Sequence, residues 1–116
     1  MHYIYIGTTK NNIIKIGMSK NPINRALQIK QFYGYKSFKL EKMQGFEADA
    51  NIVELIEAHL RGDILTNFKG LKLKGRDFIV TPNKDTRHII VDCFELFIND
   101  LLSQYSKAGL IKYIIA

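Results

Sequence analysis

The chain has 116 residues, of which 47% are apolar and 24% are charged. This balance is typical of one soluble, folded domain, and it excludes an intrinsically disordered chain. Lys and Arg outnumber Asp and Glu by 17 to 11, which gives a formal net charge of +6 and raises the expectation of a polyanionic partner such as nucleic acid.

Other classes of protein are excluded by what the sequence lacks. Cys93 is the only cysteine, so an internal disulfide and a thiolate zinc cage are both excluded. Charged residues interrupt every apolar run well before the ~20 residues that a membrane span requires, and the first residues lack the layout of a secretion signal. We therefore expect a single cytoplasmic domain over residues 1–116. The abundance of Ile, Lys, Asn and Tyr suggests an AT-rich coding genome, as in many phages and viruses, and for a phage or viral protein the location would be the host cytoplasm.

The first predicted elements are two strands over residues 3–7 and 13–18, which are rich in β-branched and aromatic residues and flank the turn sequence TTKNN. We expect them to form a β-hairpin. Because side chains alternate between the faces of a strand, Tyr5 and Ile4 should lie on opposite faces of the first strand. By the same rule Lys15 should face away from Ile14 and Ile16 in the second strand.

A helix is predicted over residues 22–32. Asn21 can accept a hydrogen bond from the free amides at its start, and Pro22 suits the first helical position. Gly34 is expected to end this helix. A third strand is then predicted within residues 35–46.

The remainder of the chain predicts two more helices around an extended segment. Apolar residues at helical spacing follow residues 48–50, and Gly62 is a candidate for an early end of that helix. Residues 67–82 alternate leucine with lysine between glycines and a proline, which indicates an extended, hairpin-like segment. The clearest amphipathic helix spans residues 89–102. The apolar tail over residues 109–116 is expected to pack on the sheet or on a second copy, as a homodimer.

The predicted order is β, β, α, β, α, extended, α. This order indicates an α/β (α+β) sandwich, in which a small central and mainly antiparallel β-sheet is flanked by helices.

The phrase YIYIG and, after a short turn, KIGMSKNPINR resemble the two half-motifs of the GIY-YIG nuclease superfamily. The similarity is to its small phage and viral branch, where the second half-motif often reads KIG. It continues more loosely through a helix with a glutamate to the closing stretch KGRDFIV. The resemblance implies one nuclease domain with a motif core over residues 3–80 and a C-terminal helix and tail over residues 84–116.

The resemblance also implies a chemistry, which is hydrolysis of a DNA phosphodiester by water with one divalent metal ion, Mg²⁺ or alternatively Mn²⁺. Tyr5 matches the tyrosine that acts as general base, and a phenol pKa of ~10 requires a nearby cation for that task. Lys15 stands at the position of the second tyrosine and can supply this cation or, when neutral, accept the proton. Arg25 matches the arginine that binds the phosphate in the transition state.

Local structure gives an independent reason to single out Arg25. In the first turn of a helix that begins at Pro22, the helix dipole favours acidic residues over basic ones. Residues that break a local preference are concentrated at working sites. The free amides there and the Ser19 hydroxyl would also favour an anion.

The metal-binding glutamate is either Glu57 or Glu54, both of which lie on the second predicted helix. At ~100° per residue, Glu57 lies on the flank of the apolar stripe centred on Ile56, whereas Glu54 points nearly opposite to it. A glutamate that reaches over a sheet should come from the flank. We therefore favour Glu57 as the ligand and keep Glu54 as the second choice.

Four residues are predicted to contact the nucleic acid: Ser19, Lys20, Lys72 and Lys74. The lysines near residues 69–76 suit a DNA backbone, although lysines also protect solvated edge strands. Taken singly, each proposed site residue is also an ordinary strand or helix residue, and only the shared order and spacing favour a nuclease. No separate DNA-reading domain follows the core, so low sequence specificity is expected.

A second hypothesis is a catalytically inactive, nuclease-like module that binds DNA as a regulator or inhibitor of a nucleic-acid machine. It stays open because Tyr3 stands where the family usually has glycine, and because two glutamates compete for the role of metal ligand.

Overall fold

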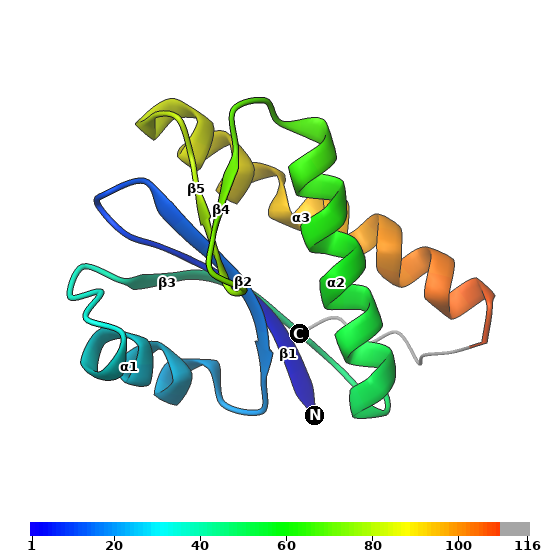
Figure 1. Ribbon diagram of the computed structural model, residues 1–116. Coiled ribbons are helices and arrows are strands. Elements are labelled where there is room, and N and C mark those ends of the chain that lie inside the picture. Colours follow the sequence, from blue (N-terminus) through cyan, green and yellow to red (C-terminus); the bar gives the residue numbers. More distant parts are fainter. Residues whose placement is uncertain (110–116) are drawn as a thin grey trace.

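The computed structural model describes residues 1–109 and shows a five-stranded sheet with three helices (Figure 1). The strands are β1 (His2–Thr8), β2 (Ile13–Ser19), β3 (Lys39–Phe46), β4 (Lys72–Lys74) and β5 (Phe78–Val80). The helices are α1 (Pro22–Phe32), α2 (Ala50–Asn67) and α3 (Lys84–Lys107). The predicted α+β class is therefore confirmed, and the segment predicted as extended forms the β4–β5 hairpin.

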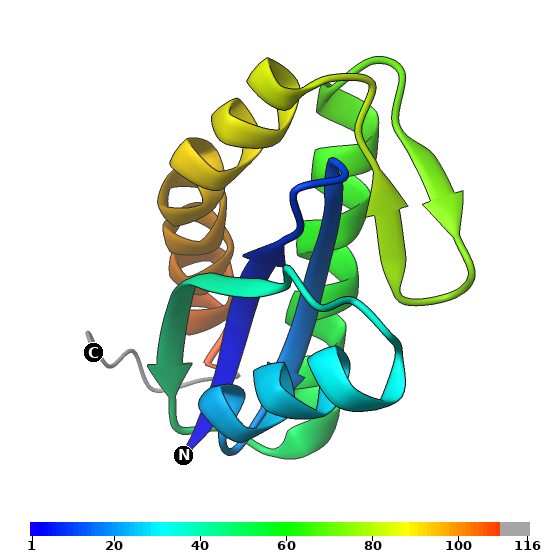
Figure 2. The ribbon, with the colours of Figure 1, turned by 90° about the vertical axis from the view of Figure 1, so that its left-hand side faces the viewer.

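The sheet is antiparallel throughout, with the strand order β3-β1-β2-β5-β4. β1 and β2 form the predicted hairpin, in which Tyr5 pairs with Gly17. β5 pairs with β2 only at Ile13 and Ile14, because the short hairpin then diverges from the sheet (Figure 2). Among the described strands, none continues this pairing from Lys15 onward, so that edge of β2 is open to side chains from elsewhere.

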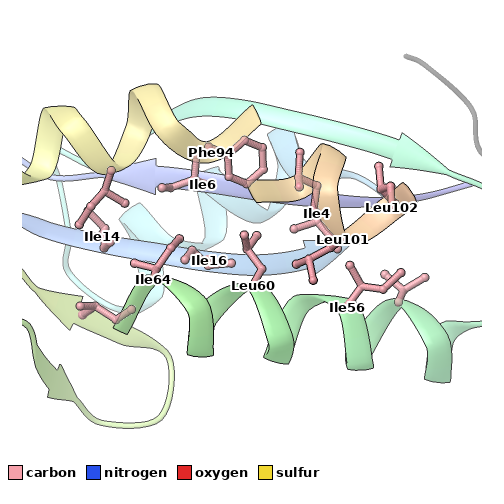
Figure 3. Close-up of a cluster of buried hydrophobic side chains, with 14 of the residues drawn as sticks. Ile4, Ile6, Ile14, Ile16, Ile56, Leu60, Ile64, Phe94, Leu101 and Leu102 are labelled. Carbon is pink, nitrogen blue, oxygen red and sulfur yellow. The ribbon is translucent and has the colours of Figure 1, made fainter. Parts of the chain in front are cut away.

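Strand alternation sorts the side chains of β1 and β2 to two faces, as predicted, and each face carries a layer of core. Ile4, Ile6, Ile14 and Ile16 pack against α2 and α3 in the larger layer (Figure 3). Tyr5 points to the other face, where it packs with residues of α1 and with Phe38 and Phe78. Because α1 covers this second face (Figure 2), the tyrosine is buried there rather than left in solvent.

α1 has the bounds that its local signals predict. Asn21 caps it, with its Oδ1 accepting a hydrogen bond from the backbone N–H of Asn24 at 3.1 Å, and Pro22 is the first helical residue. Beyond the cap residue Tyr33, Gly34 adopts a positive φ of 72°, which ends the helix.

α2 continues through Gly62 to Asn67, so the candidate early end at this glycine is wrong. Leu60 and Ile64 are both fully buried against the sheet on either side of Gly62. Their burial outweighs the ~1 kcal/mol that a helical glycine costs relative to alanine.

β3 begins at Lys39, later than the predicted segment, because residues 35–38 form a turn closed by the Phe38 N–H donating to the Tyr35 carbonyl at 2.9 Å. The homodimer prediction depends on the apolar tail, and residues 110–116 lie outside the described part of the chain. No helix within residues 1–109 is both long and apolar enough to cross a membrane.

Candidate active site

A cavity of about 410 Å³ lies beside the open edge of β2, where α1, α2 and the β4–β5 hairpin approach the sheet. The four residues predicted to act in catalysis all line it: Tyr5, Lys15, Arg25 and Glu57. They come from four different elements, β1, β2, α1 and α2 respectively. The fold therefore brings together groups that the sequence places far apart.

Tyr5 reaches the cavity across β2, and Gly17 makes this path available. A Cβ atom added to Gly17 would lie 2.7 Å from the phenol oxygen, which is closer than two such atoms can approach. The Tyr5 residue is only 1% exposed. Burial raises the pKa of this phenol to about 12, although the neighbouring Arg25 guanidinium acts in the opposite direction. The phenol is therefore protonated at neutral pH in the unliganded protein.

Lys15 is a buried cation with two partners from the hairpin. Its Nζ lies 3.9 Å from Oδ1 of Asp77 and 5.2 Å from the centroid of the Phe78 ring. Burial lowers the pKa of Lys15, while the Asp77 carboxylate favours the charged form. Asp77 is half-exposed and also lines the cavity. Asp77 is the acidic residue of the segment KGRDFIV, but the motif resemblance assigned it no role.

Arg25 lies in the first turn of α1, at the position where an acidic residue would suit the helix dipole better. Its Nη1 donates a hydrogen bond to Oε1 of Gln28 at 3.2 Å, and its Cζ lies 6.0 Å from the Tyr33 ring centroid. These contacts hold a half-buried guanidinium at the cavity with donors left for an anion.

Glu57 faces the cavity from α2 and forms an ion pair with Arg61, one turn further along the same helix. Burial raises the pKa of Glu57, and Arg61 acts against this shift. The pairing of Arg61 with Glu57 was not predicted from the sequence. A spacing of four residues between opposite charges on a helix is the usual signal for such a pair.

Glu54 also lines the cavity, one turn before Glu57, but it is exposed. The prediction that Glu54 points away from the apolar stripe did not anticipate its place in the cavity lining. Residues three apart lie within ~60° of each other around a helix, so Glu54 and Glu57 can face the same cavity. The structure thus brings both candidate glutamates to the same cavity.

The residues present fit a single Mg²⁺ or Mn²⁺ ion held by few protein ligands. Within residues 1–109 no cluster of three or more His, Cys, Asp or Glu side chains is suited to a metal ion. Mg²⁺ is commonly bound through one or two carboxylates, with water and substrate phosphate oxygens as the other ligands. Glu57, with Glu54 beside it, provides that donor set.

The four residues predicted to contact nucleic acid lie outside the cavity lining. Ser19 ends β2, and its Oγ accepts a hydrogen bond from the Asn21 N–H at 2.9 Å at the start of α1, next to the exposed Lys20. Lys72 and Lys74 are exposed on the edge strand β4.

Comparisons of the chain with family models, with curated proteins and with solved structures each found no match. The motif residues and their geometry in the cavity are therefore the observations that bear on function.

Proposed function

We propose that the chain is a metal-dependent DNA endonuclease of the GIY-YIG type, which hydrolyses phosphodiester bonds with low sequence specificity in the cytoplasm. The observation that carries this proposal is the convergence of Tyr5, Lys15, Arg25 and Glu57 on one cavity from four separate elements. A set of unrelated surface residues would not be expected to meet in this way.

In the proposed mechanism, Tyr5 takes a proton from the attacking water as it passes its own proton to the neutral amine of Lys15, which becomes an ammonium group. Burial raises the pKa of Tyr5 to about 12, so the phenol does not lose its proton unaided at neutral pH. The Arg25 guanidinium acts against this shift and favours the phenolate. Burial lowers the pKa of Lys15 and so favours its neutral amine, which is the form that can accept a proton.

Arg25 binds the scissile phosphate and stabilises the charge that develops on it in the transition state. Glu57, with Glu54, would hold the metal ion, which supplies Lewis-acid activation of the phosphate and the leaving oxygen when bound. The Glu57 carboxylate is shared with Arg61 in the structure, so loading the site requires this ion pair to open or to share the carboxylate.

Nicking of supercoiled plasmid in Mg²⁺ or Mn²⁺ tests this proposal. We expect the wild-type protein to nick, and we expect Tyr5→Phe, Arg25→Ala and Glu57→Gln each to lower the rate by at least about 100-fold, the usual contribution of one catalytic group. Tyr3→Phe is the matched control, since it removes a hydroxyl from the same strand outside the cavity lining. The proposal is wrong if the wild type nicks no faster than these variants.

The second candidate is an inactive, nuclease-like module that binds DNA as a regulator or inhibitor. Two observations favour it. The Glu57 carboxylate is already in an ion pair with Arg61, and Tyr5 is almost completely buried. This candidate predicts salt-dependent retention of DNA that EDTA does not change, together with no nicking in either metal. Binding and nicking measured on the same preparation distinguish the two functions.

A further inference from the structure

Three aromatic rings connect the end of α1 with the β4–β5 hairpin. The Phe78 ring centroid lies 5.7 Å from that of Tyr33 and 4.6 Å from that of Tyr35, with interplanar angles of 60° and 47°. We call Tyr33, Tyr35 and Phe78 the three-ring cluster. In Figure 2 the connection that follows α1 and the turn of the hairpin lie on the same side of the sheet.

Each ring of the cluster carries one cation. Arg25 Cζ lies 6.0 Å from the Tyr33 centroid, Lys15 Nζ 5.2 Å from that of Phe78, and Lys74 Nζ 5.4 Å from that of Tyr35. Two of these cations, Arg25 and Lys15, also line the cavity. The three-ring cluster therefore contacts two side chains of the candidate active site.

The rings differ in their access to solvent. Phe78 is 6% exposed and belongs to the smaller core layer, and Tyr35 is half-buried, but Tyr33 is 48% exposed. A large aromatic ring that is half open to water and lies beside an arginine of the cavity lining is the arrangement that single-stranded nucleic-acid sites use to stack bases.

We propose that Tyr33 is a stacking subsite for an unpaired nucleobase next to the scissile phosphate. This inference deepens the proposed function and rests on it, since it places that phosphate at Arg25. Within a duplex each base is already stacked on its neighbours, and its face is not accessible. A base can stack on Tyr33 only at a flap, gap, loop or single strand, so nucleic acid with unpaired nucleotides is the preferred substrate class.

The charge around the ring agrees with this occupant. The neighbouring residues Lys36 and Lys74 are exposed, as is Arg76 in the hairpin turn. A strand whose base stacks on Tyr33 would carry its flanking phosphates between Arg25 on one side and the cations of the hairpin on the other.

Binding in EDTA tests the proposal without cleavage. The probes are a fluorescent single-stranded thymidine oligonucleotide and the same oligonucleotide with abasic sites, which has equal phosphate charge but lacks bases. We expect wild type to bind the thymidine probe more tightly than the abasic one, and Tyr33→Ala to weaken binding of the thymidine probe alone by about 5- to 150-fold, the range for one stacked base. Tyr33→Phe should retain the preference.

Phe32→Ala is the matched control, because Phe32 is the adjacent aromatic residue, is 78% exposed and lies outside the three-ring cluster. Tyr33→Leu keeps an apolar side chain without a ring and decides the question if the alanine variant does not fold. The proposal is overturned if wild type binds both probes equally, if it binds neither, or if Tyr33→Leu keeps the preference. Absence of nicking with the preference intact would remove the proposed nuclease function and leave the stacking subsite standing.

Discussion

At the scale of single residues, the position of Tyr5, the proposed general base, depends on Gly17. It is the cross-strand partner of Tyr5 and lies directly against the phenol. Any side chain at this position would occupy the path of the ring to the cavity. Glycine is thus needed in the second half-motif because the Tyr5 phenol occupies the space of a side chain. Backbone conformation is not the reason, since the φ of Gly17 is not positive.

We expect Gly17→Ala to lower the nicking rate by about 100-fold, because a shift of the reacting group by ~1 Å has a cost of this size. The added Cβ would lie 2.7 Å from the phenol oxygen and must displace it. Plasmid nicking at fixed Mg²⁺ measures the effect, and circular dichroism shows whether the fold is retained. Unchanged nicking would mean that the phenol position does not matter for the reaction.

Gly7→Ala is the comparison for this prediction. It places a Cβ 2.2 Å from the ring of Phe38, which is fully buried in the smaller core layer. Overpacking of this kind costs about 1–3 kcal/mol of unfolding free energy. Gly7→Ala should therefore reduce stability in a denaturant titration, whereas Gly17→Ala should act mainly on the reaction.

The sequence predicted the four polar side chains that line the cavity, but it did not predict the charged residues that pair with them. Tyr5, Lys15 and Arg25 could be found because they belong to a contiguous motif whose strands and helix have clear local signals. Asp77 could not be assigned, because its approach to Lys15 depends on how the β4–β5 hairpin diverges from β2. That geometry is a property of tertiary packing and leaves no periodic signal in the sequence.

At the scale of elements, the helices show which boundaries local signals can predict. Asn21, Pro22 and Gly34 define α1 within a few residues of its ends, so its bounds follow from the sequence alone. α2 has no such stop signal at its true end, and the glycine within it was a misleading one. Burial of its apolar stripe decides where α2 ends, and the extent of that burial is known only once the sheet is in place.

Gly62→Ala should stabilise the protein by about 0.8–1 kcal/mol, because alanine has the higher helix propensity and the added methyl group has free space. Gly62 is exposed, and no atom lies within 4 Å of the position of its added Cβ. Chemical denaturation monitored at the α-helical signal measures the change, and nicking should not be affected. A loss of stability would show that α2 needs the flexibility of glycine at this point.

At the scale of the whole molecule, the candidate site lowers the free energy of unfolding, because it buries ionisable groups. Burial shifts the pKa of Lys15 downward and that of Glu57 upward, so the protein disfavours the charged form of each group. Sites built for chemistry often carry such a cost.

Lys15→Met should therefore raise the melting temperature at pH 7 while abolishing nicking. Methionine fills similar volume without a buried charge, and Asp77, which loses its partner, is half-exposed, so this loss costs at most about 1 kcal/mol. Because the pKa of Lys15 is depressed, its penalty is present at low and neutral pH and disappears as the pH rises toward the ordinary value of 10.5. The gain in melting temperature should shrink over the same range.

Calorimetry of the two proteins at pH 7 and at pH 10 measures this difference. Lys42→Met, which removes a more exposed lysine paired with Glu95, is the control and should give no comparable gain. A lower melting temperature for Lys15→Met at pH 7 would show that the contacts with Asp77 and Phe78 outweigh the cost of burying the ammonium group.

The assembly of the cavity from β1, β2, α1, α2 and the β4–β5 hairpin has a consequence for the life of the protein. A nascent chain on the ribosome lacks a complete cavity until the segment with Asp77 has emerged and docked against β2. Under the proposed nuclease function, a chain that stops before this segment would lack the complete cavity and would not be expected to cut DNA.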